Sequence, residues 1–164
     1  MDVLVVTPHP FRMTAGVPDT MISLDPGGEW AAWSGVDLAS DGERKSVVLV
    51  AIAVTSFVTA PGAAPAEELG AILRARHPAG TAVIEELGTA EGNPALRIRC
   101  TVTEQRGGRS VTTGQAQAFV VFPGAGALGV VSAVCLDVAD LDHAARLVAG
   151  IAARMTVTAA TAAA

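Results

Sequence analysis

The sequence predicts an α+β fold, in which an antiparallel sheet carries two main helices packed on it. Three observations support this prediction. Residues 82–136 read as consecutive strands joined by short turns, a helical repeat at 66–77 precedes them, and a second helical repeat at 141–155 follows them. Because the strands come in one run and do not alternate with helices, an antiparallel sheet is favoured over a parallel one.

The length of 164 residues fits one domain with its own hydrophobic core. We expect this domain to span residues 1–158. The tail at 159–164 consists of alanine and threonine alone and has nothing large to bury, so it is predicted to be disordered.

Prolines and glycines divide the first forty residues into short pieces, and strands fit between them at 2–6 and 20–24. Residues 46–59, SVVLVAIAVTSFVT, form a longer apolar run that is rich in β-branched side chains. Such a run is typical of a central strand covered on both faces. A last, short edge strand is expected at 156–158.

The first predicted helix starts near Pro65, since proline suits the first helical turn, and ends at His77, because a residue before proline avoids the helical region. The second predicted helix follows Asp140, whose side chain suits the N-cap position. Its apolar repeat consists of Leu141, Ala144, Ala145, Val148, Ile151 and Met155. Both helices therefore have one apolar side with which to cover a sheet.

The hairpin between residues 95 and 122 decides which side chains share a sheet face. A three-residue loop at 107–109 places Cys100 opposite Ala116 and Ile98 opposite Ala118, so that one face is apolar and rich in small residues. That face suits a closely packed helix. The other face then gathers the polar group Arg97, Arg99, Gln115 and Gln117, with Phe119 at one end.

A G-x-G-x-x-G pattern occurs at Gly124, Gly126 and Gly129, and this spacing is found in dinucleotide-binding turns. Such a turn needs a helix directly after the glycines, so that a pyrophosphate can sit at the helix N-terminus. Residues 128–134 instead read LGVVSAV, which predicts a strand. The pattern is therefore interpreted as a glycine-rich hairpin loop.

Composition and motifs exclude several classes of function. The net charge is −5, the pI is about 5.1 and Lys45 is the single lysine, so the cationic stripe of a nucleic-acid-binding protein is missing. No apolar run approaches membrane-spanning length, and the first residues do not form a signal peptide, which predicts a cytoplasmic protein. No catalytic, metal-binding or cofactor motif is present, and a non-enzymatic protein is expected.

The two cysteines, Cys100 and Cys135, fall on predicted strands that flank a third strand. Two strand spacings separate their backbones by roughly 10 Å, whereas a disulfide needs Cα atoms within about 7 Å. Two free thiols are therefore predicted.

A binding role remains, and another protein is the expected partner. The polar face with Arg97, Arg99, Gln115, Gln117 and Phe119 is the candidate surface, since arginine and glutamine donate directional hydrogen bonds and Phe119 adds an apolar anchor. Trp30 and Trp33 are either packing residues or a solvent-facing hot spot beside that face. The alternative is a carrier of a small apolar molecule or lipid, with a cleft between the sheet and a helix.

The order of these elements resembles the PsbP-like superfamily. The stretches that carry the resemblance are PAEELGAILRARHP, the Gly-Gly hairpin and DLDHAARLVAGIAARMTV. The superfamily includes the Mog nuclear-import proteins, the LpqN-like lipoproteins and the Eag-type effector chaperones. The resemblance implies an α/β/α sandwich and a role in binding; no functional residue is carried over.

Overall fold

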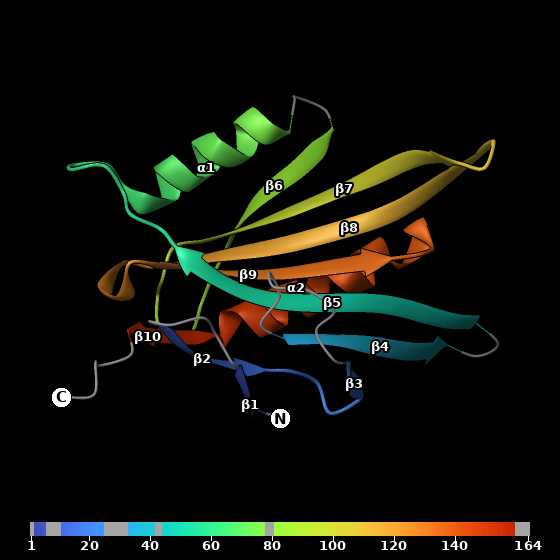
Figure 1. The fold of residues 1–164 in the computed structure, drawn as a ribbon, viewed down its shortest axis with the longest axis horizontal. Helices are drawn as coiled ribbons and strands as arrows, with labels where there is room; N and C mark the ends of the chain where they lie inside the picture. Colours follow the sequence, from blue (N-terminus) through green and yellow to red (C-terminus); the bar gives the residue numbers. More distant parts are fainter. Residues whose placement is uncertain (1, 6–10, 25–32, 42–43, 78–80, 160–164) are drawn as a thin grey trace.

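The fold is taken from a computed structural model, which describes residues 2–5, 11–24, 33–41, 44–77 and 81–159. It contains a three-stranded sheet in the order β1-β2-β10 and a seven-stranded sheet in the order β3-β4-β5-β9-β8-β7-β6, and every pair of neighbours is antiparallel (Figure 1). The strands are β1 (Asp2–Val5), β2 (Phe11–Gly16), β3 (Met21–Leu24), β4 (Trp33–Asp41), β5 (Arg44–Ser56), β6 (Ala82–Leu87), β7 (Ala95–Arg106), β8 (Arg109–Phe122), β9 (Ala127–Cys135) and β10 (Thr156–Ala159). The helices are α1 (Pro65–Arg76) and α2 (Leu141–Ala153), with short 3-10 turns η1 (Pro123–Ala125) and η2 (Val138–Asp140).

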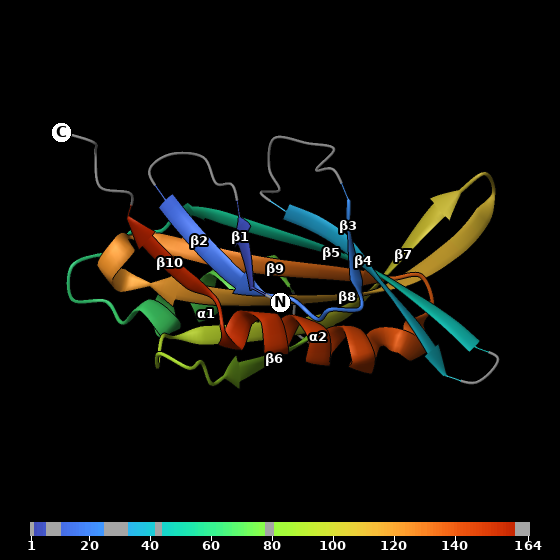
Figure 2. The same cartoon turned by 90° about the horizontal axis from the view of Figure 1, so that it is seen from below.

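The two helices lie on opposite faces of the large sheet, which confirms the predicted α+β class and its sandwich arrangement. One face is covered by α2 together with the small sheet (Figure 2), and we call it the α2 face. The other, the α1 face, packs against α1. Each predicted helix is present, with ends that differ by one or two residues from the expected ones.

The main core lies on the α2 face. The facing positions of β8 and β9 are small, with Ala116, Ala118 and Ala133 all at most 1% exposed. Against them α2 presents its buried side, which includes Ala144 and Val148. Small residues on both elements let the helix approach the sheet closely, as the alanine-rich pattern of β8 predicted.

The α1 face has a smaller core. Leu69 and Leu73 of α1 are buried against a patch of the sheet that includes Ile98 and Val121. Pro65 occupies the first position of α1, and His77 follows its last turn as the C-cap residue. This helix covers the end of the sheet that holds β7 and β8 (Figure 1).

The predicted register of the β7–β8 hairpin is wrong. The turn contains two residues, Gly107 and Gly108, and Arg106 pairs with Arg109 across it. Both glycines have positive φ, +57° and +78°, which is the conformation of a type I′ turn and matches the twist of the two strands. The register is therefore one residue away from the expected one, and every residue of β7 lies on the opposite face from the one predicted.

The glycine-rich segment forms a turn between two strands, as predicted. Pro123–Ala125 make the 3-10 turn η1, Gly126 has a φ of +60°, and β9 begins at Ala127. A strand, and not a helix, follows Gly126, so the segment lacks the following helix that a dinucleotide-binding turn requires.

The structure differs from the prediction at three further places: strand β5, strands β2 and β4, and Ala159. The predicted long strand is β5, but it is not covered on both faces, because Leu49 is 44% exposed. Strands β2 and β4 were not predicted, since neighbouring prolines and glycines obscured them. Ala159, expected in the disordered tail, is the last residue of β10, and residues 160–164 lie outside the described residues.

Candidate binding surfaces

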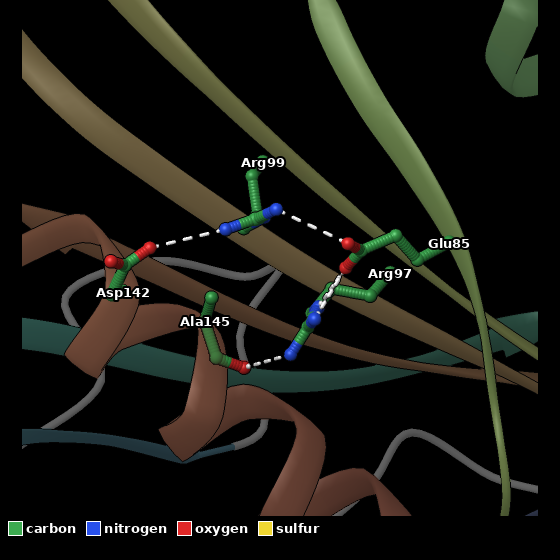
Figure 3. A network of polar contacts seen from close by, with 5 residues as sticks. All are labelled: Glu85, Arg97, Arg99, Asp142 and Ala145. Atoms are coloured by element: carbon green, nitrogen blue, oxygen red, sulfur yellow. Dashed lines mark hydrogen bonds and ion pairs between the residues drawn. The ribbon is translucent and has the colours of Figure 1, made fainter.

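Arg97 and Arg99 lie on the α2 face, where both are held in an ion-pair network (Figure 3). The Nε of Arg97 donates to Oε2 of Glu85 on β6 at 2.9 Å, and its Nη1 donates to the backbone oxygen of Ala145 in α2 at 3.1 Å. Arg99 donates to Oε1 of Glu85 and to Oδ1 of Asp142, each at 3.1 Å. The network connects the edge strand β6 to α2 through β7.

The charges of this network compensate one another. The Arg97 and Arg99 side chains are 18% and 28% exposed, and both guanidinium groups already have carboxylate partners. The hydrogen bond from Arg97, reinforced by the positive charges of both arginines, lowers the pKa of Glu85 below its usual 4.5. A partner protein would have to break these pairs in order to bind the arginines. The pairs therefore act within the fold, where they hold α2 and the edge strand β6 together.

Gln115, Gln117 and Phe119 lie on the α1 face, away from the arginines. They pair directly with Cys100, Ile98 and Leu96 of β7, all on that same face. The side-chain amide of Gln117 donates to Ser132 of β9 at 3.0 Å. The single polar face that the sequence predicted does not exist, because the one-residue change in register separates its members onto two faces.

The structure describes one of the two tryptophans, Trp33. Trp33 is 8% exposed and belongs to the main core, which agrees with the packing interpretation and not with a solvent-facing hot spot. Trp30 lies outside the described residues.

Beyond α1, the α1 face carries exposed aliphatic side chains. Ile22 and Leu24 of β3, Leu38 of β4 and Leu49 of β5 are 52%, 42%, 53% and 44% exposed. The pairings of β3 with β4 and of β4 with β5 place all four on one face. We call this surface the open half-face. The partly buried Val36, Val47 and Val134 lie between and beside them on the same face.

A groove of about 370 Å³ runs between α1 and the sheet, and we call it the α1 groove. Its apolar walls come from Leu69 and Leu73 of the helix and from Phe119 and Leu128 of the sheet. Gln117 and Thr55 also line this groove and are polar groups on its sheet side. This is the cleft between sheet and helix that the alternative carrier hypothesis requires.

The two cysteines lie on the strands next to β8, and His143 and Asp140 lie in α2 and at its N-cap. Both thiols are free, as predicted, and Cys100 and Cys135 lie on opposite faces of the strands that flank β8. Burial raises the pKa of each thiol above the usual 9.0, so neither is an activated nucleophile at neutral pH. The Nε2 of His143 is 2.8 Å from Oδ2 of the buried Asp37, which ties α2 to β4. Asp140 occupies the N-cap position of α2 without a side-chain cap bond.

Within the described ranges, no group of three or more histidine, cysteine or acidic side chains is arranged to hold a metal ion. Neither described helix combines the length and the apolar character that crossing a membrane requires.

The antiparallel sheet with one helix on each face defines an α/β sandwich of the α+β class. Among solved structures, the chain is similar to LpqN of Mycobacterium tuberculosis, described as involved in cell envelope biogenesis, with a TM-score of 0.53 and 18% identity over 96% of this chain and 91% of LpqN. At this identity the likeness shows the fold alone, and the chain has an LpqN-like fold. No protein-family model matches the chain, and no curated protein matches it.

Sequence reasoning missed the open half-face. The alternating large aliphatics of β3 and β4 carried a signal, but the first forty residues are so rich in turn formers that no strand was assigned to β4. The predicted long strand β5 showed apolar residues on both faces, and no local pattern indicates that one face stays exposed.

Proposed function

We propose that the chain is a non-catalytic binding domain, an adaptor or chaperone-like module, and that its protein partner docks on the open half-face. One observation carries the proposal: four large aliphatic side chains on a single sheet face are each between 42% and 53% exposed. Contiguous apolar patches of this kind mark interaction sites on soluble proteins, because burying them against a partner removes apolar surface from water.

The shape of the surface favours a protein over a small molecule. Small ligands bind in concave sites that enclose most of their surface, whereas the open half-face extends across three neighbouring strands of a sheet. A broad apolar surface of this form matches the core of a protein–protein interface. The LpqN-like fold is compatible with a binding or adaptor role.

The test is affinity capture of partners by the wild-type chain and by a Leu38→Glu/Leu49→Glu variant. Both substituted side chains are about half exposed, so the variant is expected to fold and to lose its partners. The control is Val58→Glu, which changes an aliphatic side chain that is 82% exposed in the loop after β5. An unchanged set of partners in the double variant would remove the open half-face from the proposal.

The α1 groove supports a second candidate, the carrier of a small apolar ligand. Its volume of about 370 Å³ lies within the range of known ligand sites, and its walls are mostly apolar. The side chain of Ile72 lines the groove and is 39% exposed, so it can be altered without removing a core residue.

Native mass spectrometry of freshly purified protein tests the carrier. A retained small molecule is expected in the wild-type chain and in Ala71→Glu, which alters an exposed neighbour outside the groove lining, and not in Ile72→Glu. A clean mass for the wild-type chain from several growth conditions would contradict this second candidate.

A further inference from the structure

The α1 groove has a charged group as well as apolar walls. Most of its lining residues are apolar, and Thr55 and Gln117 are polar but neutral. Among the lining residues that the structure describes, Arg76 of α1 is the only charged one. A site of this composition suits a ligand that is mainly apolar and carries one negative charge.

The helix presents its apolar residues and Arg76 to the groove from one side. Leu69, Ile72, Leu73 and Arg76 are spaced at i, i+3, i+4 and i+7, so they share one side of α1. Seven residues of an α-helix rise about 10.5 Å, which separates Leu69 from Arg76 along the helix axis. The helix wall of the groove is therefore apolar at one end and cationic at the other.

The order of the elements places Gln117 toward the cationic end. Helix α1 follows β5, whose last residue, Ser56, pairs with the neighbour of Leu128 on β9. The helix then leads to β6, which begins at Ala82, in line with the residue two positions before Gln117 on β8. Figure 1 shows α1 running from the end of β5 toward the start of β6. The C-terminal end of α1, with Arg76, therefore lies toward Gln117.

Both polar groups at this end have hydrogen-bond donors to offer. Within the described ranges, the guanidinium of Arg76 has no hydrogen bond or ion pair, in contrast to Arg97 and Arg99. The side-chain amide of Gln117 uses one of its two N–H groups for Ser132, at 3.0 Å, which leaves the second N–H for a ligand. The donors and the positive charge at this end call for an anionic acceptor.

We propose that the α1 groove binds a single-chain carboxylate, with the alkyl chain between α1 and the sheet and the carboxylate at Arg76. This inference rests on the second candidate of the proposed function, the carrier, and names the class of its ligand. The chain is held because its burial removes apolar surface from water. The guanidinium can donate two parallel hydrogen bonds to the carboxylate, which fixes the direction in which the chain lies.

Charge and volume favour a single-chain carboxylate over other amphiphiles. One guanidinium balances the single charge of a carboxylate, whereas a phosphate monoester carries about 1.5 to 2 negative charges at pH 7. A neutral head group would leave the guanidinium of Arg76 without a counter-charge. The volume of about 370 Å³ is near the lower end of the range of ligand sites, so the groove suits one alkyl chain and not two.

Titration calorimetry with three chain-matched probes tests the assignment on the full chain, below the concentration at which each probe forms micelles. The probes are decanoate, decanol and decyl phosphate. Decanoate is expected to bind at least about threefold more tightly than decanol, the gain of one partly exposed ion pair. Decyl phosphate is expected to bind no more tightly than decanoate. Tighter binding of decyl phosphate would overturn the assignment of a carboxylate.

A matched pair of variants tests the role of Arg76. Arg74 and Arg76 are both exposed and both lie in the last turn of α1, so Arg74→Gln and Arg76→Gln remove the same charge from the same helix end. Arg74 does not line the groove. Arg76→Gln is expected to bind decanoate only as tightly as decanol, and Arg74→Gln is expected to behave as the wild-type chain. Equal losses in the two variants would overturn the proposal.

The remaining outcomes separate this inference from the carrier itself. If the wild-type chain binds neither decanoate nor decanol, both the carrier and the inference fail. If it binds the two equally, the carrier stands and the carboxylate assignment is overturned. Leu38→Glu/Leu49→Glu is expected to retain decanoate, and Ile72→Glu, with its added carboxylate one turn before Arg76, is expected to lose it. The opposite result would place the ligand on the open half-face and overturn the proposal.

Discussion

The two faces of the large sheet are built from similarly apolar strands, yet they are covered to different extents. Strand β5 shows the contrast most directly: Val48, Val50 and Ile52 on the α2 face are at most 2% exposed, whereas Leu49 between them is 44% exposed. The α2 face is covered by a helix and a second sheet, while α1 covers the other face only over its β7–β8 end.

The two faces differ in how far other elements cover them and not in composition, and this difference distinguishes the packed α2 face from the proposed binding surface. Where α2 and the small sheet lie, the apolar side chains are buried and close-packed, and Arg97 and Arg99 are paired with carboxylates. Where no element covers the sheet, large aliphatics remain exposed to solvent. Substitutions on the α2 face should therefore lower the free energy of unfolding. Substitutions on the open half-face should weaken the binding of a partner and leave stability nearly unchanged.

The largest effect is expected for Ile52→Ala on the α2 face. Ile52 is fully buried, and truncation leaves a cavity, so the free energy of unfolding should fall by about 2–5 kcal/mol. Urea denaturation measures the change. A loss below about 1 kcal/mol would mean that this face is not the tightly packed one.

A smaller loss, about 1–3 kcal/mol of unfolding free energy, is expected for Gly114→Ala. A Cβ at this position would lie 2.5 Å from Sγ of Cys135 and 3.3 Å from Cδ1 of Leu141. The double variant Gly114→Ala/Cys135→Ala should lose less stability than the two single changes together, because it removes the closest clash. Strict additivity in urea denaturation would contradict this close approach.

Glu85→Gln tests the network that connects β6 to α2. At neutral pH it should lower the free energy of unfolding by about 1–2 kcal/mol, since both arginines lose a charged partner. The pKa of Glu85 is lowered in the folded state, so its contribution is complete above pH 4.5 and declines as the pH falls from there toward the folded value.

The pH dependence of this variant gives a sharper readout than its stability alone. Thermal unfolding of both chains between about pH 3 and 7 should show the gap between wild type and Glu85→Gln narrowing below pH 4.5. A gap that widened on acidification would mean that the carboxylate is not stabilised in its charged form.

The smallest effect on stability is expected for Leu49→Ser on the open half-face. This side chain is 44% exposed, and the free energy of unfolding should change by about 0.5 kcal/mol or less. Binding of the captured protein partner should weaken several-fold in the same variant. A stability loss comparable to that of Ile52→Ala would show that Leu49 is covered within the monomer.

Much of the candidate site lay beyond sequence reasoning. Arg97, Arg99, Gln115 and Gln117 were all assigned to one surface, and a one-residue error in register was enough to separate them. The rule that burial sets register failed because the partly buried arginines have partners on β6 and α2, and these contacts form only in the folded structure. The turn itself held the correct information, since Gly107 and Gly108 suit a two-residue I′ turn.

The sequence by itself determined the two helices, the antiparallel run β7–β8–β9, the free thiols and the strand after Gly126, because each depends on periodicity or turn chemistry within a short stretch of chain. Only the tertiary structure decided that β5 pairs with β9, that Glu85 meets Arg97, and that Leu49 stays exposed. These features depend on which elements meet across the sheet. The sequence of an apolar strand does not indicate whether a helix will cover it.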